Sequence, residues 1–410
     1  MTVSVAILGS TGSIGASTLD VIARHPDKYR VSGLSANGNL AAMRKQCAAF
    51  NPELAVMADA AAARQLAGEL PGAGLQTRVS GGPEGLSELA GGDADIVVCG
   101  IVGAAGLRST LAAVRGGKKV LIANKEPLVM LGGLIMREAR AHGATVIPLD
   151  SEHNAIFQCL PAGGYAAGTR PAGVARILLT GSGGPFRRLP PGDFCRVTPA
   201  QARAHPNWDM GPKVSVDSAT MMNKGLELIE ACVLFSVGVD DIEIVIHPQS
   251  VVHSMVEYVD GSILAQLGSP DMRVAIANAL GWPQRIDSGA RRLSLPECAR
   301  LDFEAPDHRR FPCIGLARDA GRTGGTLPAV MNAANEVAVD AFLHHGLRFD
   351  RIAQVVEATM ARAEAGPDCT LEGVLEADRQ ARRRCRELLP GVAAAAVAVG
   401  GACVVSEVGS

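Results

Sequence analysis

The feature that most constrains the fold is a glycine-rich loop that directly follows a short apolar run near the start of the chain. Val3–Leu8 leads into Gly9-Ser-Thr-Gly-Ser-Ile-Gly15, and an amphipathic stretch through Leu19 and Ile22 follows. A strand, a glycine-rich turn and a helix N-terminus together form an anion site, because unpaired N–H groups and the helix dipole face a pyrophosphate. A lone loop of this kind fits a plain turn equally well. Its place at the first βα junction favours dinucleotide binding.

The pattern beyond this loop predicts an α/β protein. β-branched runs at Ile96–Cys99, Lys119–Ala123 and Thr145–Pro148 alternate with helical stretches, which is typical of a Rossmann-like parallel sheet covered by helices. A mixed α+β pattern follows, then a Pro- and Arg-rich stretch, then a helical remainder in which an apolar stripe from Val330 to Ala341 ends before Gly346. We therefore expect a dinucleotide-binding domain at 1–149, an α+β catalytic domain at 150–282, a linker at 283–312 and a C-terminal helical domain at 313–410.

Composition argues against several functional classes. The formal net charge of -2 and the 3% aromatic content give no reason to bind nucleic acid or an anionic membrane surface. No apolar run reaches the roughly 18 residues that a membrane span needs, and no signal peptide is evident at the N-terminus. The ten cysteines are scattered without a C-x-x-C pair, which fits free thiols in a reducing cytoplasm.

The second strand, expected around Val31–Leu34, bears on the choice of dinucleotide. It ends in Ser35-Ala-Asn-Gly-Asn39, where no Asp or Glu stands to bind the ribose hydroxyl of NAD. The absence favours NADP, although no Arg or Lys is present there for the 2′-phosphate.

Asp150 and Glu152 lie where a strand gives way to a helix. In one interpretation Asp150 caps that helix and Glu152 complements its dipole. In the other, the two carboxylates bind a hard cation such as Mg²⁺ or Mn²⁺. The pair taken alone favours capping.

A helix expected to begin at Asp217 makes the cation-binding interpretation of Asp150 and Glu152 stronger. One side of it is an apolar stripe at helical spacing: Met222, Leu226, Ile229 and Val233. Asn223, Lys224 and Glu227 share the other side. This side is either a solvated face with a surface ion pair worth about 0.3 kcal/mol, or part of a site in which Glu227 is a third metal carboxylate. In the second case Asn223 and Lys224 contact a substrate phosphate, with Ser218 adding a hydroxyl.

Two loops carry polar groups that packing does not require. The loop Thr180–Pro185 is able to present N–H groups and the Ser182 hydroxyl to an anion, and a plain turn fits it equally well. The loop His205–Pro212 places Trp208 in a Pro- and Gly-rich setting that suits closure over a substrate, where a buried structural Trp is the usual alternative.

The motifs taken together, in order, resemble the 1-deoxy-D-xylulose 5-phosphate reductoisomerase family over nearly the whole chain. Besides the glycine loop they are Asn124-Lys-Glu126, Asp150-Ser-Glu-His-Asn-Ala-Ile-Phe157, Leu179-Thr-Gly-Ser-Gly-Gly-Pro-Phe186, His205-Pro-Asn-Trp208, Ser215-Val-Asp-Ser-Ala-Thr-Met-Met-Asn-Lys-Gly-Leu-Glu227, His247-Pro-Gln-Ser250 and Asn332-Ala-Ala-Asn-Glu336. The resemblance implies a homodimer. It also implies conversion of 1-deoxy-D-xylulose 5-phosphate, a sugar phosphate, to 2-C-methyl-D-erythritol 4-phosphate with NADPH and Mg²⁺ or Mn²⁺.

The resemblance also implies the site residues. The expected metal ligands are Asp150, Glu152 and Glu227, and with Lys125 and His205 they make up the expected catalytic set. The expected substrate contacts are Ser151, Glu152, Ser182, His205, Trp208, Met210, Ser218, Asn223, Lys224 and Glu227. The expected cofactor contacts are Gly9, Thr11, Gly12, Ser13, Ile14, Asn37, Gly38, Asn39, Asn124, Lys125, Glu126 and Gly211. Gly38 stands where many relatives carry a basic residue, and Pro127 stands where serine is expected.

Two other readings stay open on the sequence. A dehydrogenase of the semialdehyde or homoserine type also joins a dinucleotide domain to an α+β domain, but it needs no metal carboxylates. A dinucleotide-sensing regulator would bind NADPH without turnover, and gives no reason for the metal and phosphate residues to occur together.

Overall fold

The computed structural model describes residues 2–161, 169–204 and 211–398, and the chain packs into two compact units. The first unit comprises Met1–Pro127, Gly132–Ala172 and Ala265–Ser294, and the second comprises Leu128–Leu131, Gly173–Leu264 and Leu295–Ser410. These units are defined by packing alone. The functional domain boundaries at 149, 282 and 312 therefore stay a prediction.

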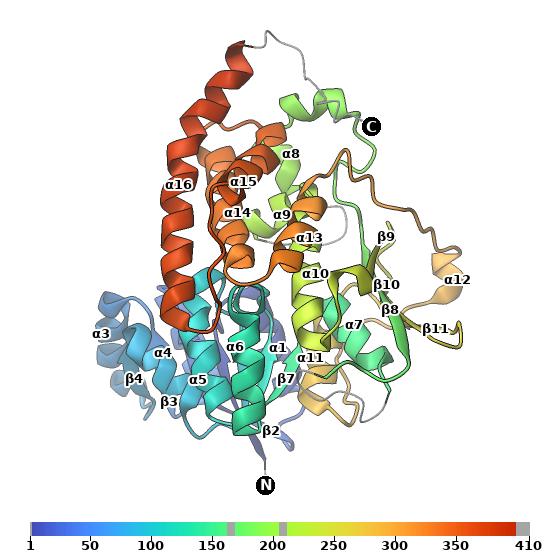
Figure 1. Ribbon diagram of the computed structural model, residues 1–410. Helices are drawn as coiled ribbons and strands as arrows, with labels where there is room; N and C mark the ends of the chain where they lie inside the picture. The colour runs from blue at the N-terminus through green and yellow to red at the C-terminus, as the bar shows by residue number, and fades with distance from the viewer. Residues whose placement is uncertain (1, 162–168, 205–210, 399–410) are drawn as a thin grey trace. The chain divides into compact units, whose positions relative to one another are not determined.

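A seven-stranded parallel sheet forms the centre of the first unit (Figure 1). Its strands are β1 (Val3–Leu8), β2 (Tyr29–Ala36), β3 (Leu54–Met57), β4 (Arg78–Gly81), β5 (Ile96–Cys99), β6 (Lys119–Ile122) and β7 (Thr145–Pro148). Their order across the sheet is β4-β3-β2-β1-β5-β6-β7. The chain thus moves outward from β1 and then returns to its other side with β5. In sheets of this kind, ligands bind at the carboxyl ends of the strands where the order reverses, so β1 and β5 mark the expected dinucleotide position.

Helices pack against this sheet and leave its central strands buried. They are α1 (Ser13–Ala23), α2 (Leu40–Phe50), α3 (Ala60–Glu69), α4 (Gly82–Gly91), α5 (Leu107–Arg115), α6 (Glu126–His142), α7 (Ser151–Cys159) and α11 (Met272–Gly281), with 3-10 turns at η1 (Pro71–Ala73) and η2 (Gly103–Gly106). Every residue of β5 is buried. Burial on both faces explains why the strand reads as a continuous apolar run, and the α/β class expected from the sequence is confirmed.

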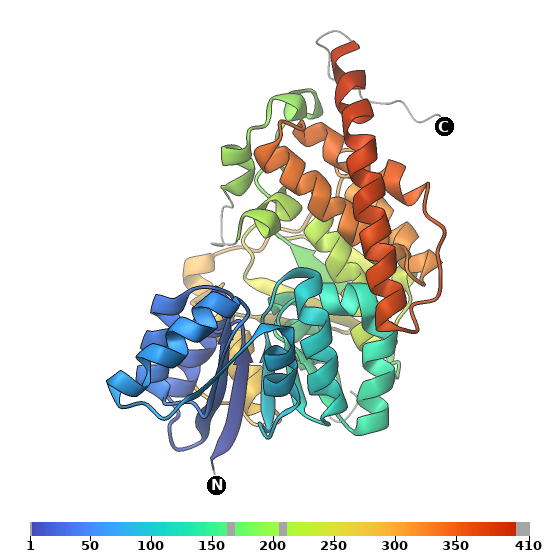
Figure 2. The same ribbon diagram turned by 90° about the vertical axis from the view of Figure 1, so that its left-hand side faces the viewer.

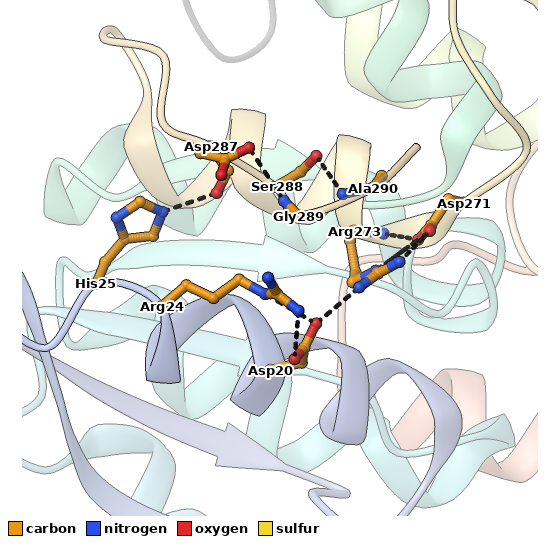
Figure 3. Close-up of polar contacts among 9 residues, drawn as sticks. All are labelled: Asp20, Arg24, His25, Asp271, Arg273, Asp287, Ser288, Gly289 and Ala290. Carbon is orange, nitrogen blue, oxygen red and sulfur yellow. Dashed lines mark hydrogen bonds and ion pairs between the residues drawn. The ribbon is translucent and has the colours of Figure 1, made fainter. Parts of the chain in front are cut away.

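Helix α11 comes from far along the chain and packs against α1. Figure 3 shows how the two are fastened: Arg273 of α11 donates through Nη1 to Asp20 Oδ2 of α1 at 2.9 Å. Its Nη2 atom donates to Asp271 Oδ2, at the start of α11, at 2.7 Å. His25 Nε2 lies 2.7 Å from the carbonyl oxygen of Asp287. The residues around α11 therefore hold the carboxyl-terminal end of the helix that follows the glycine loop.

The same segment is also fastened to β6 and α7. Lys119 Nζ donates to the carbonyl oxygens of Leu280 at 3.0 Å and Trp282 at 2.9 Å, and burial lowers the pKa of this amine to about 8. Asn154 of α7 donates to Asn278 Oδ1 at 3.3 Å. Residues 265–294 thus tie together the helix after the first strand and the helix after the seventh.

The second unit contains a four-stranded mixed sheet in the order β11-β10-β8-β9. Its strands are β8 (Val174–Gly181), β9 (Ile242–Ile246), β10 (Val252–Tyr258) and β11 (Ile263–Leu267). Strand β8 pairs in parallel with β9 and antiparallel with β10.

Helices make up most of the remainder of the second unit. They are α8 (Pro199–Arg203), α9 (Pro212–Ala219), α10 (Met222–Phe235), α12 (Leu295–Cys298), α13 (Cys313–Thr323), α14 (Leu327–His344), α15 (Ile352–Met360) and α16 (Leu371–Ala398), with 3-10 turns at η3 (Pro191–Arg196), η4 (Val239–Asp241) and η5 (Phe349–Arg351). The long α16 lies along α14 and α15 (Figure 2). The stripe predicted from Val330 to Ala341 is buried on α14. None of the helices in the described part of the chain has both the length and the apolarity that crossing a membrane requires.

The prediction that one helix begins at Asp217 is wrong, because two helices meet near this position. Helix α9 ends at Ala219, and α10 begins at Met222. Between them Met221 has a φ of 62°, in the left-handed region. Ser218 therefore lies near the end of one helix and not at the start of the next. The break turns the chain so that α10 leaves in a new direction.

Candidate active site

The glycine loop after β1 is built almost entirely from backbone. Gly9 has a φ of +81°, and a Cβ placed on it would lie 2.7 Å from the carbonyl oxygen of Gly100. A Cβ on Gly15 would lie 2.4 Å from Ser10 Cα and from its carbonyl oxygen. Gly12 is the N-cap residue of α1 and has no side chain with which to cover the first N–H groups. The loop therefore leaves helix N–H groups open at the position where a pyrophosphate binds.

Side chains hold this loop from behind. Gly9 N donates to the hydroxyl of Ser35 at 3.1 Å. The hydroxyl of Ser10 donates to Gln46 Oε1 at 2.6 Å, and Gln46 Nε2 donates back to the Ser10 carbonyl at 2.9 Å. Sequence reasoning did not single out Gln46, because only its contact across 36 residues reveals its role.

The residues expected to distinguish NADP from NAD follow β2. Asn37, Gly38 and Asn39 are exposed, whereas Ser35 is buried. Asn39 caps α2 by accepting a hydrogen bond from Ala42 N at 3.2 Å. The side-chain oxygen of Asn39 is thus already hydrogen-bonded. The side-chain NH₂ group of Asn39 and the side chain of Asn37 remain to face a ligand.

Asn124, Lys125 and Glu126 lie where β6 passes into α6. The Nδ2 atom of Asn124 is buried and has no hydrogen-bond partner within residues 2–161, 169–204 and 211–398. A buried donor of this kind is costly unless a ligand or water completes it. Asn124 is thus suited to donate a hydrogen bond to a bound cofactor.

Lys125 forms an ion pair with Asp150 across the ends of β6 and β7. Lys125 Nζ lies 2.8 Å from Asp150 Oδ2, and both side chains are largely buried. Burial opposes ionisation of Asp150, but the positive charge of Lys125 outweighs it and holds the pKa of this carboxyl well below its ordinary value. Asp150 occupies the N-cap position of α7, but its side chain makes no capping bond to that helix. The capping interpretation is therefore wrong for Asp150.

Glu152 is the second residue of α7, next to Ser151. The Ser151 hydroxyl donates to Glu152 Oε2 at 2.6 Å. One end of the first unit thus holds two carboxyl groups together with a lysine and a hydroxyl. Carboxylates in this arrangement suit a hard divalent cation.

The polar side of α10 is buried, which rules out the solvated-face interpretation. The side chain of Lys224 is 5% exposed and that of Glu227 is 1% exposed, and the two form an ion pair. Asn223 Nδ2 donates to Glu227 Oε1 at 2.5 Å. Burying a charged pair is expensive, so this face is better explained as a binding site than as a solubilising surface.

The glycine loop after β8 lies against the same residues. A Cβ on Gly181 would lie 2.6 Å from Lys224 Cε, and a Cβ on Gly184 would lie 2.4 Å from the carbonyl oxygen of Ser218. Between these glycines, Ser182 accepts a hydrogen bond from Gly184 N at 3.2 Å. The structure thus brings the Ser182 loop, the end of α9 and the polar side of α10 together in the second unit.

The remaining expected residues fall into three groups. His205, Trp208 and Met210 lie outside the described residues. Gly211 is the N-cap residue of α9 and accepts hydrogen bonds from Ser215. The expected metal carboxylates are divided between units, with Asp150 and Glu152 in the first and Glu227 in the second.

Fold and polar residues together define a class of protein: an α/β oxidoreductase that uses a dinucleotide. Three family models match the chain. They describe 1-deoxy-D-xylulose 5-phosphate reductoisomerase at residues 5–132, its C-terminal domain at 146–235, and a further DXP reductoisomerase C-terminal domain at 267–384. The chain belongs to the 1-deoxy-D-xylulose 5-phosphate reductoisomerase family, and the resemblance seen in the sequence is confirmed.

Individual relatives agree with the family models. A 1-deoxy-D-xylulose 5-phosphate reductoisomerase from Ectopseudomonas mendocina is 59% identical over 94% of this chain and 98% of its own. The Zymomonas mobilis reductoisomerase, solved with NADPH, is 47% identical over 95% of this chain and 99% of its own, with a TM-score of 0.88. A reductoisomerase solved with NADPH, fosmidomycin and magnesium is 46% identical over 95% of this chain and 98% of its own, with a TM-score of 0.91.

Proposed function

We propose that the chain converts 1-deoxy-D-xylulose 5-phosphate to 2-C-methyl-D-erythritol 4-phosphate, by isomerisation and reduction, with NADPH and a divalent metal. The observation that carries this proposal is the buried set on α10, where Asn223, Lys224 and Glu227 lie beside the Ser182 loop. A dehydrogenase of the semialdehyde or homoserine type has no need for a buried Lys–Glu pair at this position. The family match and the NADPH and magnesium in solved relatives support the same conclusion.

We propose Asp150, Glu152 and Glu227 as the metal ligands. The residues fit a hard cation, because all three offer carboxylate oxygens and Lys125 keeps Asp150 ionised. When bound, a divalent cation supplies positive charge beside substrate oxygens on which negative charge develops. Lys125 adds a further positive charge, and Ser151 orients Glu152 through its hydroxyl.

The substrate phosphate takes no part in the chemistry, so its contacts serve for binding and orientation. We assign these contacts to Ser182, Ser218, Asn223 and Lys224. We assign closure over the substrate to His205, Trp208 and Met210. Exclusion of water by such a loop strengthens every charge interaction inside the site.

The cofactor contacts are proposed at the loop after β1 and at Asn124. The residues fit a dinucleotide, because Gly15 lets α1 pack directly against the Ser10 backbone of the loop, Gly12 leaves the first N–H groups of α1 uncovered, and the buried Nδ2 atom of Asn124 is a donor for a ligand. NADPH when bound supplies the hydride for reduction. Selectivity for its 2′-phosphate is assigned to Asn37, Gly38 and Asn39, which offer amide donors in place of a basic side chain.

A homodimer is part of the proposal. Val259 is 78% exposed, and Ile263 and Leu264 of β11 are each 50% exposed. Apolar side chains on an edge strand and just after its neighbour β10 favour a protein contact, and we infer that a second copy of the chain covers them. Light scattering on Ile263→Asp compared with the wild type would test this. A dimer that persists unchanged in the variant would refute this surface.

We also infer that the protein works in the cytoplasm. Nine cysteines in the described part of the chain are free, which suits a reducing compartment. Cell fractionation would test this, and recovery of the protein outside the cytoplasm would overturn it.

The first experiment is the rate of NADPH oxidation with 1-deoxy-D-xylulose 5-phosphate, in the presence of Mg²⁺, Mn²⁺ or a chelator, with NADH in parallel. We expect metal-dependent turnover and a preference for NADPH. Equal use of NADH would keep the reaction and refute the cofactor assignment. NADPH binding by a folded chain without any turnover would favour the sensing regulator or another substrate.

A further inference from the structure

The motif at 332–336 contains two buried asparagines for which the proposed function has no use. Asn332 and Asn335 lie on α14, and both are 0% exposed. A buried amide costs free energy unless it is hydrogen-bonded. Their partners differ: Asn335 Nδ2 donates to Asp217 Oδ1 at 2.7 Å, whereas Asn332 Nδ2 donates to Glu336 Oε1 at 3.1 Å. Only Asn335 reaches the helix that precedes α10.

Asp217 lies in the last turn of α9, at the joint between α9 and α10. It is 1% exposed, and Lys213 Nζ lies 3.0 Å from its other carboxylate oxygen. The hydroxyl of Thr220 donates to the Asp217 carbonyl at 3.2 Å and accepts from Met222 N at 3.3 Å. Asp217 is therefore bonded through its side chain to α14, and the Thr220 hydroxyl links its backbone carbonyl to the first residue of α10.

The joint has little room for movement. Met221 is held in the left-handed region, where a residue with a side chain is strained. The carbonyl of Ser218 lies so close to Gly184 that a Cβ there would be at 2.4 Å. A shift of the last turn of α9 therefore displaces the Ser218 hydroxyl and changes the direction in which α10 presents Asn223.

We propose that Asn335 is a positioning residue for the substrate phosphate. Through its bond to Asp217 it fixes the end of α9, and thereby places the Ser218 hydroxyl and the start of α10. A buried hydrogen bond to a carboxylate is suited to this task, because it is directional and stronger than a bond between neutral groups. The inference rests on the proposed function, since the phosphate contacts of Ser218 and Asn223 are taken from it.

The test compares Asn335→Ala with Asn332→Ala, which removes an equally buried asparagine one turn away on the same helix. Steady-state kinetics are measured for both, together with thermal unfolding and the Kd for NADPH. We expect Asn335→Ala to raise the KM for 1-deoxy-D-xylulose 5-phosphate about 10- to 100-fold, the cost of a misplacement of about 1 Å in a binding site. Asn332→Ala should keep the wild-type KM even if it unfolds at a lower temperature, and neither variant should change the Kd for NADPH.

A rescue variant separates positioning from general destabilisation. Asp217→Asn combined with Asn335→Asp exchanges donor and acceptor and keeps one hydrogen bond between α9 and α14. We expect this double variant to recover most of the lost affinity for substrate. If Asn335→Ala does not fold, the test is the KM of the double variant compared with that of Asp217→Asn. The single variant Asp217→Asn keeps Asn335 but lacks the carboxylate.

Three results would overturn the inference: a wild-type KM in Asn335→Ala, an equal rise in Asn332→Ala, or no recovery in the double variant. Each of these is read against an active wild-type enzyme, so it leaves the proposed function standing. An inactive wild type instead refutes the proposed function, and the inference is then overturned with it.

Discussion

The glycine loop of the first unit is built from backbone groups, whereas the polar side of α10 in the second unit is built from side chains. The loop after β1 is backbone, with Gly15 packed so closely that a Cβ would lie 2.4 Å from Ser10. The side of α10 is made of buried side chains that hold one another, as Glu227 holds Asn223 and Lys224. A site made of backbone depends on the absence of atoms. A site made of side chains depends on the charge and position of each group, so the two should fail under different substitutions.

The largest effect is expected where a charge is removed from the side-chain site. Glu227→Gln keeps the shape of the residue and removes its negative charge, so the proposed metal site loses a carboxylate and Lys224 loses its ion pair with Glu227. We expect turnover to fall on the order of 10³-fold, as when one essential electrostatic group is removed, with the Kd for NADPH unchanged. Glu243→Gln, in the same unit but with a side chain that is 51% exposed, is the control. Full activity in Glu227→Gln would exclude it as a metal ligand.

The backbone site should respond to a single added methyl group. Gly15→Ala forces a carbon against the Ser10 backbone, and overpacking of this kind costs about 1–3 kcal/mol. We expect binding of NADPH to weaken by about 10- to 100-fold, measured by titration of the intrinsic fluorescence of bound NADPH. Gly68→Ala is the control, because a Cβ on Gly68 has no atom within 4 Å. Equal NADPH affinity in the two variants would contradict a backbone-made cradle.

A smaller effect is expected at Gly181, where a glycine backbone packs against the side chain of Lys224. A Cβ on Gly181 would lie 2.6 Å from Lys224 Cε, but a lysine chain is able to shift more easily than backbone. We therefore expect Gly181→Ala to raise the KM for substrate about 3- to 10-fold, within the range of modest overpacking. Kinetics on Gly315→Ala, which has open space around it, provide the comparison. A KM that is unchanged by both substitutions would show that Lys224 has room to spare.

The smallest effect is expected at the contact between α1 and α11. The hydrogen bond from Arg273 lowers the pKa of Asp271, and hydrogen bonds from Arg24 and then from Arg273 lower the pKa of Asp20. Such carboxylates stabilise the fold fully above their ordinary pKa of 3.8, and the stabilisation is lost as the pH falls further through the lowered value. We expect Arg273→Gln to lower the free energy of unfolding by about 0.5–1 kcal/mol at neutral pH.

Urea unfolding at several pH values checks this prediction. The difference between the wild type and Arg273→Gln should shrink as the pH falls below the ordinary carboxyl pKa and disappear below the lowered pKa. Arg44→Gln, which removes a single 3.3 Å surface pair with Glu69, should change stability less. A difference that is constant at all pH values would show that Arg273 acts by packing and not by charge.

Local patterns predicted much of the first unit. The strands β1, β5 and β7 fall where β-branched runs are bounded by turn residues, because burial on both faces of a parallel sheet requires continuous apolar sequence. The glycine loop was also identified from local sequence, because only glycine tolerates a backbone as crowded as at Gly15. Features set by neighbouring residues were thus accessible from the sequence.

Features set by distant contacts were not accessible. The helical pattern correctly put Lys224 and Glu227 on one side of α10, but only tertiary packing shows that this side is buried. The break at Met221 has no sequence signal, because methionine does not favour the left-handed region. Asn335 meets Asp217 across 118 residues, and no local pattern links them.

The discontinuity of the first unit bears on how the protein is made. Its central sheet is finished at Pro148, but α11 and the residues after it, which cover α1 and tie down α7, come from Ala265–Ser294. As a chain leaves the ribosome, domains that are continuous in sequence fold as they emerge. Here the ribosome must add more than a hundred residues after β7 before Arg273 is able to reach Asp20. Until those residues emerge, the face of α1 that α11 covers has no partner from this segment, so the first unit completes its packing only late in synthesis.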